Sequence, residues 1–377
     1  MSGHLSIALV AGARPNFMKI APLYHALAAR KEADRAKGID LRVSIVHTGQ
    51  HYDENMSDVF FRDLGIPAPD RHLEVGSGSH AEQTARIMIA FEKVVSEDRP
   101  DFVVVVGDVN STIACALTAK KLGVKVAHVE AGLRSFDMGM PEEINRKLTD
   151  AISDLLFVTE ESGVRNLRSE GVPEERIFLV GNVMIDTLKR NLKRIESGEF
   201  VPTGTVGDFC AGAKRYAVLT LHRPSNVDAK ETLVPLWGAI SEIARRIPIF
   251  FPVHPRTRGK IAEFGLGGTG VTMVDPVGYL DMLYAVKGSA MVLTDSGGLQ
   301  EETTVLGVPC VTIRENTERP VTVTMGTNYL AGTSPDAILA AAGEILSGKA
   351  KKGRVPPLWD GKAAERIAEI LLRHGPS

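Results

Sequence analysis

Phe102-Val-Val-Val-Val106-Gly107-Asp108 is the stretch of this sequence that decides the fold. Its first five residues are all apolar, so no polar residue alternates with them. A run of this kind is typical of a central strand in a parallel sheet, because helices cover both of its faces. The glycine and the aspartate then favour a turn. The stretch therefore predicts an α/β protein in which this strand lies inside a buried sheet.

The same pattern recurs along the chain on both sides of this stretch. A short β-branched run is followed by a turn and then by a segment of helical period, which is typical of parallel strands joined by helical crossovers. The predicted strands comprise residues 7–10, 42–47, 102–106, 124–129 and 155–158, and in a second series residues 216–221, 249–253, 271–274, 290–294 and 308–312. The predicted helices comprise residues 15–30, 229–246, 280–286, 298–306, 336–347 and 362–374.

The length of the chain predicts two domains, because 377 residues exceed what one hydrophobic core usually serves. Residues 197–214 are rich in glycine and polar side chains, and we interpret them as a surface loop near the hinge. We expect the chain to cross between the domains somewhat earlier, near Gly181-Asn182. The last predicted helix can pack on either domain.

Composition and charge exclude several classes of protein. A formal net charge of −2 and a pI near 6.6 give no overall attraction to nucleic acid or to a membrane surface. No apolar stretch approaches the ~20 residues of a membrane helix. Residues 1–13 lack the basic start of a signal peptide, so we expect a cytoplasmic protein. The three cysteines fit no paired or metal-ligand spacing, and we interpret them as buried free thiols: Cys115, Cys210 and Cys310.

Two glycine-containing strings resemble ligand-binding loops, and the elements predicted around them decide how each is interpreted. GLGGTG at residues 265–270 fits the dinucleotide-binding pattern but precedes a predicted strand, whereas a phosphate-binding loop follows one, so we interpret it as a plain loop. DSGG at residues 295–298 runs from a strand into a helix, where free N–H groups and the helix dipole favour an anion. Glu302, about one turn into that helix, could reach the hydroxyls of an attached ribose. A simply capped helix start is the alternative.

GARPNFMK at residues 12–19 occupies the matching strand-to-helix position in the first half of the chain. Arg14 lies at the mouth of this turn and Lys19 follows one helical turn later. Both side chains can therefore face a ligand placed beyond the strand ends. For this basic pair alone, a solvated helix face is an equal alternative.

Acidic residues follow the strands of the first half. Asp108 follows the strand 102–106 and Glu130 ends the neighbouring strand, and ligands of open α/β sheets gather beyond strand carboxyl ends, so we expect both in one cleft. Glu142 and Arg146 lie four residues apart at a predicted helix start and hence on one face. Taken singly, Asp108 can be a helix cap and the Glu142–Arg146 pair a surface ion pair. Three acids in successive loops favour acid–base chemistry.

Basic and imidazole side chains follow strands of the second half. His222 follows the strand 216–221 and leads into a turn, which argues for a cleft position and against a core histidine. Arg319 follows the strand 308–312. His254 is ambiguous, because it can simply shape the turn before Pro255.

Taken in order, these strings resemble the motifs of the non-hydrolysing UDP-N-acetylglucosamine 2-epimerases. Seven of them match across residues 5–372. They are GARP (12–15), GD (107–108), HVEAGLR (128–134), PEEINR (141–146), GN (181–182), DSGG through Glu302 (295–302) and TERP (317–320). One such motif is modest support, but seven in order are specific.

The resemblance implies a GT-B architecture: two Rossmann-like doubly wound domains, a cleft between them and a C-terminal helix that returns to the first domain. The implied domains are residues 1–180 with the helix 361–377, and residues 181–360, which would bind UDP. The implied reaction converts UDP-GlcNAc to UDP-ManNAc by loss of UDP, a 2-acetamidoglucal intermediate and re-addition of UDP. A homodimer working in polysaccharide biosynthesis, without nicotinamide or metal, is also implied.

The family's functional residues carry over by motif position. The catalytic candidates are Asp108, Glu130, Glu142 and His222, and which acid removes the C2 proton stays open. The substrate-binding candidates are Arg14, Lys19, Arg146, Ser296, Gly297, Gly298, Glu302 and Arg319.

Some positions depart from the family. Asn16 stands where much of the family has glutamate. Gln50 and His51 match a pair that binds an activating substrate molecule in bacterial members, but the loop 76–80 lacks the arginine that completes this site, which argues against activation. A hydrolysing epimerase, an epimerase of a related diacetamido sugar and a GT-B glycosyltransferase stay open as alternatives, and a non-catalytic sensor fits poorly with three cleft carboxylates.

Overall fold

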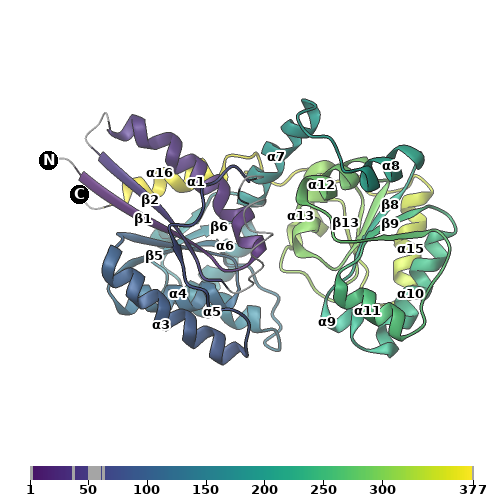
Figure 1. Ribbon diagram of the computed structural model, residues 1–377, viewed down its shortest axis with the longest axis horizontal. Coiled ribbons are helices and arrows are strands. Elements are labelled where there is room, and N and C mark those ends of the chain that lie inside the picture. The colour runs from purple at the N-terminus through teal and green to yellow at the C-terminus, as the bar shows by residue number, and fades with distance from the viewer. Residues whose placement is uncertain (1–2, 36–38, 50–60, 62–63, 376–377) are drawn as a thin grey trace. The chain divides into compact units, whose positions relative to one another are not determined.

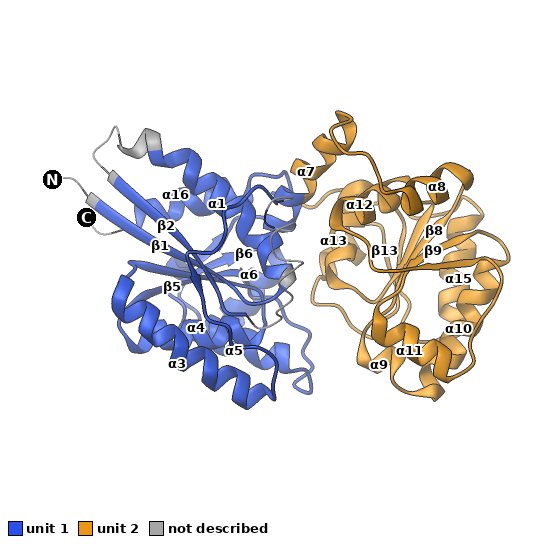
Figure 2. Cartoon of the chain, viewed as in Figure 1, with its two compact units in different colours: residues 1–187, 357–377 blue, residues 188–356 orange. Residues whose placement is uncertain are grey.

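The computed structural model describes residues 3–35, 39–49, 61 and 64–375 of the chain. The chain forms two compact units, drawn in different colours in Figure 2. Unit 1 comprises Met1–Thr187 with Pro357–Ser377, and unit 2 comprises Leu188–Pro356. Each unit has one parallel sheet with helices on both faces, so the predicted α/β class is confirmed (Figure 1).

Unit 1 contains a seven-stranded sheet in the order β3-β2-β1-β4-β5-β6-β7, with every neighbouring pair parallel. Its strands are β1 (Gly3–Ala11), β2 (Ile39–His47), β3 (Arg71–His72), β4 (Phe102–Val106), β5 (Lys125–Ala131), β6 (Leu155–Val158) and β7 (Ile177–Leu179). Its helices are α1 (Arg14–Arg35), α3 (His80–Asp98), α4 (Asn110–Lys121), α5 (Pro141–Ile152), α6 (Glu161–Ser169) and α16 (Ala363–Arg373), and α7 (Val183–Glu196) runs from unit 1 into unit 2.

Strand β4 lies in the interior of this sheet, as its unbroken apolar run predicts. All five of its residues are buried, because helices cover both faces. On one face Val103 and Val105 belong to a core cluster with Ile87 and Phe91 of α3. Helices α1 and α16 cover the opposite face (Figure 1).

Unit 2 contains a six-stranded sheet in the order β10-β9-β8-β11-β12-β13, again with all pairs parallel. Its strands are β8 (Ala217–Thr220), β9 (Ile249–Pro252), β10 (Val271–Val274), β11 (Met291–Thr294), β12 (Cys310–Thr312) and β13 (Asn328–Leu330). Its helices are α8 (Gly204–Gly212), α9 (Pro224–Val227), α10 (Lys230–Ala244), α11 (Pro255–Glu263), α12 (Tyr279–Gly288), α13 (Gly297–Leu306), α14 (Pro320–Thr324) and α15 (Pro335–Leu346).

The strands of unit 2 alternate between two separate cores. Ile249 and Phe251 of β9 pack into a cluster with α10 and α15, whereas Phe250 packs into a second cluster with α8, α12 and α13. Successive side chains of a strand point to opposite faces, so one strand supplies both clusters. This is the doubly wound arrangement that the second series of apolar runs predicts.

Helix α16 returns to unit 1, as the resemblance predicts. It packs against α1, and its first turn is held by Asp186, whose carboxylate accepts hydrogen bonds from the N–H groups of Ala363 (3.2 Å) and Ala364 (2.7 Å). Just before the helix, the indole of Trp359 is buried and donates to the carbonyl of Thr159 at 3.0 Å. Burial raises the pKa of Asp186 to about 6 although both N–H bonds favour its ionised form.

The interpretation of residues 197–214 as a surface loop is wrong, because this segment contains the helix α8. Its Val206 is fully buried, and Phe209 packs beside it against the sheet of unit 2. Tertiary packing thus outweighs the low helix propensity of its glycines. Cys210 lies on this helix and is only half-buried, so the prediction of three buried thiols holds for Cys115 and Cys310 alone.

Three strands that the sequence did not predict are β3, β7 and β13. They have only two or three residues each and lie at or next to the sheet edges, where little apolar sequence is needed. The string at residues 265–270 does precede β10, between Glu263 and Val271, and is a loop as predicted.

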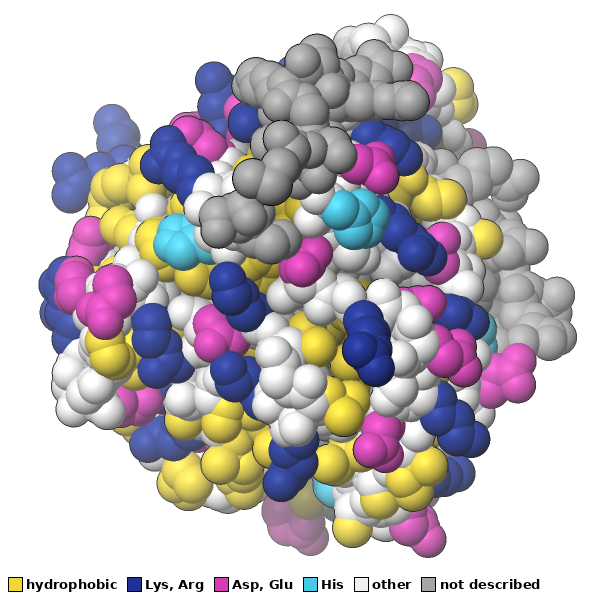
Figure 3. All heavy atoms as spheres, turned by 90° about the vertical axis from the view of Figure 1, so that its left-hand side faces the viewer, with side chains coloured by type: hydrophobic (Ala, Val, Ile, Leu, Met, Phe, Trp, Pro, Cys, Tyr) yellow, Lys and Arg dark blue, Asp and Glu magenta, His cyan; other side chains and the backbone are white. Residues whose placement is uncertain are grey.

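The surface carries charges of both signs. On the face shown in Figure 3, basic and acidic side chains are interspersed among apolar and uncharged ones. No field of a single sign therefore extends over this face. Among the described helices, none combines the length and the apolar character that crossing a membrane requires.

Candidate functional site

Each sheet has a point where the strand order reverses, and Asp108, His222 and Ser296 follow strands at these points. In unit 1 the reversal lies between β1 and β4, and in unit 2 between β8 and β11. Loops that leave two adjacent parallel strands in opposite directions create a crevice beyond their carboxyl ends, where open α/β sheets bind ligands.

A buried ion pair lies at the reversal point of unit 1. The Lys19 ammonium on α1 and the Glu130 carboxylate at the end of β5 are 2.5 Å apart, and both side chains are almost fully buried. A Cβ atom built on Gly107, after β4, would lie 2.8 Å from Lys19 Nζ, so this glycine allows the close approach. The structure thus brings Lys19 and Glu130 together, as two of the predicted site residues.

Glu130 has two further features that mark it as functional. Its φ of +71° lies in the left-handed region, and the pairing of β5 with β6 shifts register between Val129 and Ala131. Its Oε1 atom is buried and has no hydrogen-bond partner within the described residues. Strain and an unsatisfied buried carboxylate oxygen both cost free energy, and folded proteins tolerate them mostly at active sites.

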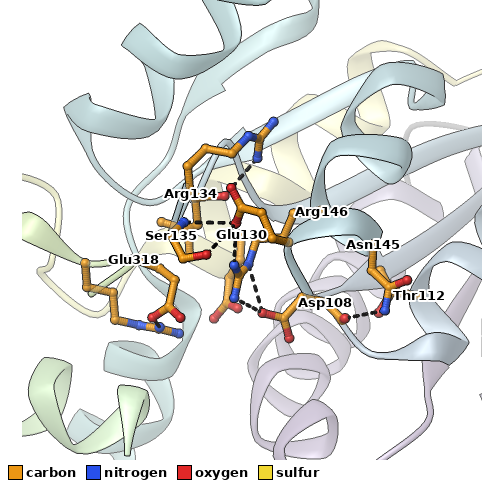
Figure 4. A network of polar contacts seen from close by, with 12 residues as sticks. Asp108, Thr112, Glu130, Arg134, Ser135, Asn145, Arg146 and Glu318 are labelled. Atoms are coloured by element: carbon orange, nitrogen blue, oxygen red, sulfur yellow. Dashed lines mark hydrogen bonds and ion pairs between the residues drawn. The ribbon is translucent and has the colours of Figure 1, made fainter. Parts of the chain in front are cut away.

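Asp108 is held by Arg146, as Figure 4 shows. Arg146 on α5 donates to Asp108 Oδ2 from Nε at 3.0 Å and from Nη2 at 2.6 Å. The amide of Asn145 donates to the Asp108 carbonyl at 2.8 Å (Figure 4). The Asp108 side chain stays partly exposed, so a carboxylate next to a fixed guanidinium faces the end of the sheet.

Glu143, which the sequence did not single out, organises this region. Its carboxylate pairs with Arg146 at 2.7 Å and accepts the backbone N–H groups of Ser135 and Phe136 at 2.9 and 3.1 Å. Burial alone raises its pKa, but these donors outweigh burial and hold the pKa below its ordinary value. Glu142, the predicted residue, lies half-buried in the first turn of α5. The sequence feature that could have identified Glu143 is its position three residues before Arg146, which puts both side chains on the same helical face.

Asn16 joins the two loops at the reversal point. Its Oδ1 accepts the N–H groups of Gly12 and Ala13 at 3.1 and 2.9 Å, and its Nδ2 donates to the Val106 carbonyl at 3.1 Å. A glutamate in this place would have no donor for that carbonyl. Arg14 begins α1. Its side chain, together with Gln50 and His51, lies outside the part of the chain that the structure describes.

In unit 2 the reversal point carries a histidine–aspartate pair. His222 Nδ1 lies 2.9 Å from Asp295 Oδ1, and the other carboxylate oxygen accepts the N–H groups of His222 and Arg223 at 2.9 and 2.8 Å. Burial raises the pKa of Asp295, but His222 and these N–H donors outweigh it, so the pKa lies below its ordinary value. Asp295 therefore holds the imidazole from behind while nearly half of the His222 side chain is exposed. The sequence signal for Asp295 was its position directly after the strand β11.

The N-terminus of α13 has several features that favour an anion. Ser296 is the N-cap residue, and Gly297 and Gly298 begin the helix. The Arg319 guanidinium lies against Gly297, because a Cβ atom there would be 2.7 Å from Arg319 Nη1. Arg319 is oriented by the buried Glu301, whose carboxylate accepts from Nε at 2.5 Å. A helix dipole and a fixed guanidinium at one place favour a negatively charged ligand.

A cavity of about 260 Å³ lies beside this helix terminus in unit 2. Its polar lining residues include His222, His254 and Ser296. His254 also caps α11 through a hydrogen bond from the Arg256 N–H at 3.2 Å, so it both shapes the turn and lines the cavity. The remaining lining residues are mostly apolar: Thr220, Leu221, Pro252, Pro276, Val277, Met282 and Leu299.

Glu302 is buried on α13 and accepts a hydrogen bond from the Tyr279 hydroxyl at 2.8 Å. Burial, reinforced by the nearby Glu301, raises the pKa of Glu302 to about 7, although the Tyr279 bond opposes this shift. The same burial and the Glu302 charge raise the pKa of Tyr279. Sequence reasoning missed Tyr279, because no local pattern links α12 to α13.

Replacing Glu302 with glutamine should stabilise the protein at pH 8 and change little at pH 4.5. A pKa raised from 4.5 to about 7 favours the folded state fully below pH 4.5, and this contribution is lost as the pH rises through 7. The shift of the Glu302 pKa corresponds to roughly 3 kcal/mol of unfolding free energy, lost between pH 4.5 and 7. A glutamine in this place stays uncharged and would not lose this stability. Urea unfolding at both pH values measures the difference. The exposed Glu242→Gln should show no such pH dependence, and equal effects of Glu302→Gln at both pH values would contradict this expectation.

The comparisons with known proteins decide the family. A family model described as UDP-N-acetylglucosamine 2-epimerase matches residues 31–372. The chain belongs to this family. The UDP-N-acetylglucosamine 2-epimerase of Methanococcus maripaludis is 42% identical over 97% of the chain and 98% of its own length. The UDP-2,3-diacetamido-2,3-dideoxy-D-glucuronate 2-epimerase of Pseudomonas aeruginosa is also 42% identical, over 98% of the chain and 100% of its own length.

A solved epimerase supports the same assignment. The Methanocaldococcus jannaschii UDP-GlcNAc 2-epimerase, crystallised in complex with UDP-GlcNAc and UDP, superposes with a TM-score of 0.85 at 43% identity, over 97% of the chain and 99% of its own. The resemblance predicted from the motifs is therefore confirmed, and so is the GT-B-like class with two Rossmann-like domains. The protein is an enzyme of the UDP-GlcNAc 2-epimerase family.

Proposed function

We propose that this enzyme interconverts UDP-GlcNAc and UDP-ManNAc without releasing free sugar. The observation that carries the proposal is the Glu130–Lys19 pair, because it combines a buried carboxylate, an oxygen without a hydrogen-bond partner among the described residues and a strained backbone. The C2 proton of the sugar is not activated, so its removal needs a base held in a fixed position.

The carboxylates of unit 1 supply the acid–base groups in this proposal. Glu130 and Asp108 follow neighbouring parallel strands, and we assign them to the proton transfers at C2. Glu130 is the stronger candidate for the base, because Arg146 already donates twice to one oxygen of Asp108. Lys19 pairs with the Glu130 carboxylate at 2.5 Å and so holds it in a fixed position.

The groups of unit 2 hold UDP in this proposal. The N-terminus of α13, with Ser296 and Arg319, binds the diphosphate and stabilises its charge as it departs. Glu302 accepts hydrogen bonds from the ribose, and the 260 Å³ cavity accommodates the flat uracil ring. His222, fixed by Asp295, donates to the diphosphate.

The proposed reaction balances without any co-reactant. A base removes the proton from C2, the bond from C1 to the UDP oxygen breaks, and a C1–C2 double bond forms. UDP then adds back to C1 while a proton arrives at the opposite face of C2. The expected intermediates are 2-acetamidoglucal and UDP, held together on the enzyme.

Incubation with UDP-GlcNAc in D₂O, followed by NMR, tests the proposal. We expect deuterium at C2 and a manno product that still carries UDP. Free N-acetylmannosamine together with UDP would instead indicate a hydrolysing epimerase. Turnover without deuterium at C2, and only with an added sugar acceptor, would indicate a glycosyltransferase.

A diacetamido sugar is a second candidate substrate. The P. aeruginosa relative acts, by its name, on a UDP-2,3-diacetamido-uronate, and it is as similar to this chain as the M. maripaludis enzyme. Equal concentrations of both UDP-sugars in one reaction measure the preference as a ratio of kcat/KM. We expect UDP-GlcNAc to react faster, and a tenfold preference for the uronate would reverse the assignment.

The remaining expectations concern assembly and location. We propose a cytoplasmic homodimer that works in polysaccharide biosynthesis. The expected domains, residues 1–180 with 361–377 and residues 181–360, are proposed as the functional division. Light scattering of the purified protein measures the mass of the assembly, and the mass of a single chain would contradict the dimer.

A further inference from the structure

A fully buried histidine lies two residues before Glu130. His128 on β5 has no exposed surface, and both of its ring nitrogens are within hydrogen-bond distance of an oxygen. Nδ1 lies 2.6 Å from Asp150 Oδ1 on α5, and Nε2 lies 2.8 Å from the carbonyl oxygen of Gly107, which follows β4. Neither oxygen is at the surface, so water does not compete for these bonds.

Both partners of His128 are acceptors. A carbonyl oxygen has no proton to give. Burial raises the pKa of Asp150, but the charges and hydrogen bonds of His128 and Arg134 outweigh burial and lower it, so this carboxyl is ionised. Both ring nitrogens therefore face acceptor oxygens, and two contacts on opposite sides fix the orientation of the imidazole.

Asp150 extends this connection to the far side of Glu130. Its second oxygen, Oδ2, accepts the backbone N–H of Gly132 at 3.0 Å and pairs with Arg134 Nη1 at 2.7 Å. Arg134 is itself held by Glu170 at 2.6 Å. The network thus links His128, which precedes the register shift in β5, to Gly132 and Arg134, which follow the end of that strand.

The backbone near this network departs in part from regular strand conformation. Gly107, Glu130 and Gly132 all have positive φ, at +69°, +71° and +78°. The ladder between β5 and β6 shifts register at the same place. Where ladder hydrogen bonds are interrupted, side-chain bonds have to fix the conformation.

We propose that His128 is a positioning residue, which fixes the spacing between Asp108 and Glu130. One ring N–H holds the Gly107 carbonyl directly before Asp108. The other holds Asp150, which in turn holds the Gly132 N–H two residues after Glu130. This inference rests on the proposed function, because the spacing matters only if both carboxylates act on one sugar. A displacement of about 1 Å can cost 10²-fold in rate.

Kinetics of His128→Gln test the proposal. Glutamine keeps a donor but cannot reach both acceptors, so we expect kcat per folded enzyme to fall by roughly 10²-fold. KM for UDP-GlcNAc and Kd for UDP should stay within about twofold, since the groups proposed to hold UDP lie in unit 2. His25→Gln is the matched control, because this partly buried histidine also bonds a backbone carbonyl, that of Leu64 at 2.9 Å, and it should keep wild-type kcat. A His128→Gln variant with kcat within threefold of wild type would overturn the proposal.

A spectroscopic measurement keeps the inference testable if His128→Gln does not fold. In protein labelled with ¹⁵N-histidine, we expect two ring N–H signals from His128 that exchange slowly with water. A single slowly exchanging signal would overturn the two-donor arrangement. Asp150→Asn, which removes the charge but keeps the shape, should lower kcat with little change in UDP affinity, and an unchanged kcat would also count against the proposal. Wild-type enzyme without epimerase activity would refute the proposed function instead, while the NMR result would still stand.

Discussion

Replacing Glu130 with glutamine should lower kcat by roughly 10³-fold, which is within the range for the loss of a positioned acid–base group. The amide cannot accept the C2 proton, so deuterium incorporation from D₂O should fall together with kcat. The affinity for UDP should change little, because the groups proposed to hold UDP lie in unit 2. Single-turnover NMR in D₂O and calorimetry with UDP measure the two quantities. A kcat within tenfold of wild type would remove Glu130 from the mechanism.

A second variant separates chemistry from stability at this position. Glu130→Gln leaves the buried Lys19 ammonium without its carboxylate partner, and breaking a buried ion pair costs about 3–5 kcal/mol. The double variant Lys19→Met/Glu130→Gln removes both charges and should regain most of this stability while staying inactive. The exposed Glu175→Gln serves as a control and should keep wild-type stability and rate.

Replacing Arg319 with alanine should destabilise the protein by about 3–5 kcal/mol and also weaken UDP binding at least tenfold. The guanidinium pairs with Glu301 at 2.5 Å and lies 3.3 Å from Glu318, and both carboxylates are buried. Removing one partner of a buried pair leaves an uncompensated charge. A lost charged hydrogen bond to the diphosphate accounts for the weaker binding. Urea unfolding and UDP titration measure the two effects.

Two further variants sharpen this test. Arg319→Lys keeps the charge but loses the planar fork, so we expect an intermediate loss of UDP affinity. Arg245→Ala removes an exposed arginine that pairs with Glu242 on the surface of the same unit, and it should cost less than about 1 kcal/mol. If Arg319→Ala and Arg245→Ala had the same free energy of unfolding, the buried Arg319–Glu301 pair would contribute nothing to stability.

The regular part of the fold could be predicted from the sequence because its signals are local. The run at β4 and its counterparts in unit 2 are unbroken, mostly apolar stretches of four or five residues, and the structure places strands where these runs lie. The helix α8 escaped prediction, because its glycines favour a loop and only the packing of Val206 against a distant sheet reverses that preference. The short edge strands β3, β7 and β13 escaped because two or three residues carry no period.

The candidate site divides in the same way. Asp108, Glu130, His222 and Ser296 could be found because each lies at or just after the end of a strand, and the rule for open sheets then places each one at the carboxyl edge of its own sheet. Their partners could not. Tyr279 meets Glu302 across 23 residues, and His128 meets Asp150 across 22, so no local spacing reveals either contact. Arg146 was paired in sequence with Glu142, but the structure shows it bonding Asp108 and Glu143.

The return of α16 to unit 1 has a consequence for the order in which the chain folds during synthesis. Unit 2 is continuous in sequence, so it can fold as soon as its last residue leaves the ribosome. Unit 1 has to wait, because Trp359 and the helix capped by Asp186 are translated after the whole of unit 2. The apolar surface of unit 1 that α16 covers then stays exposed throughout that interval, which favours chaperone binding to the nascent chain.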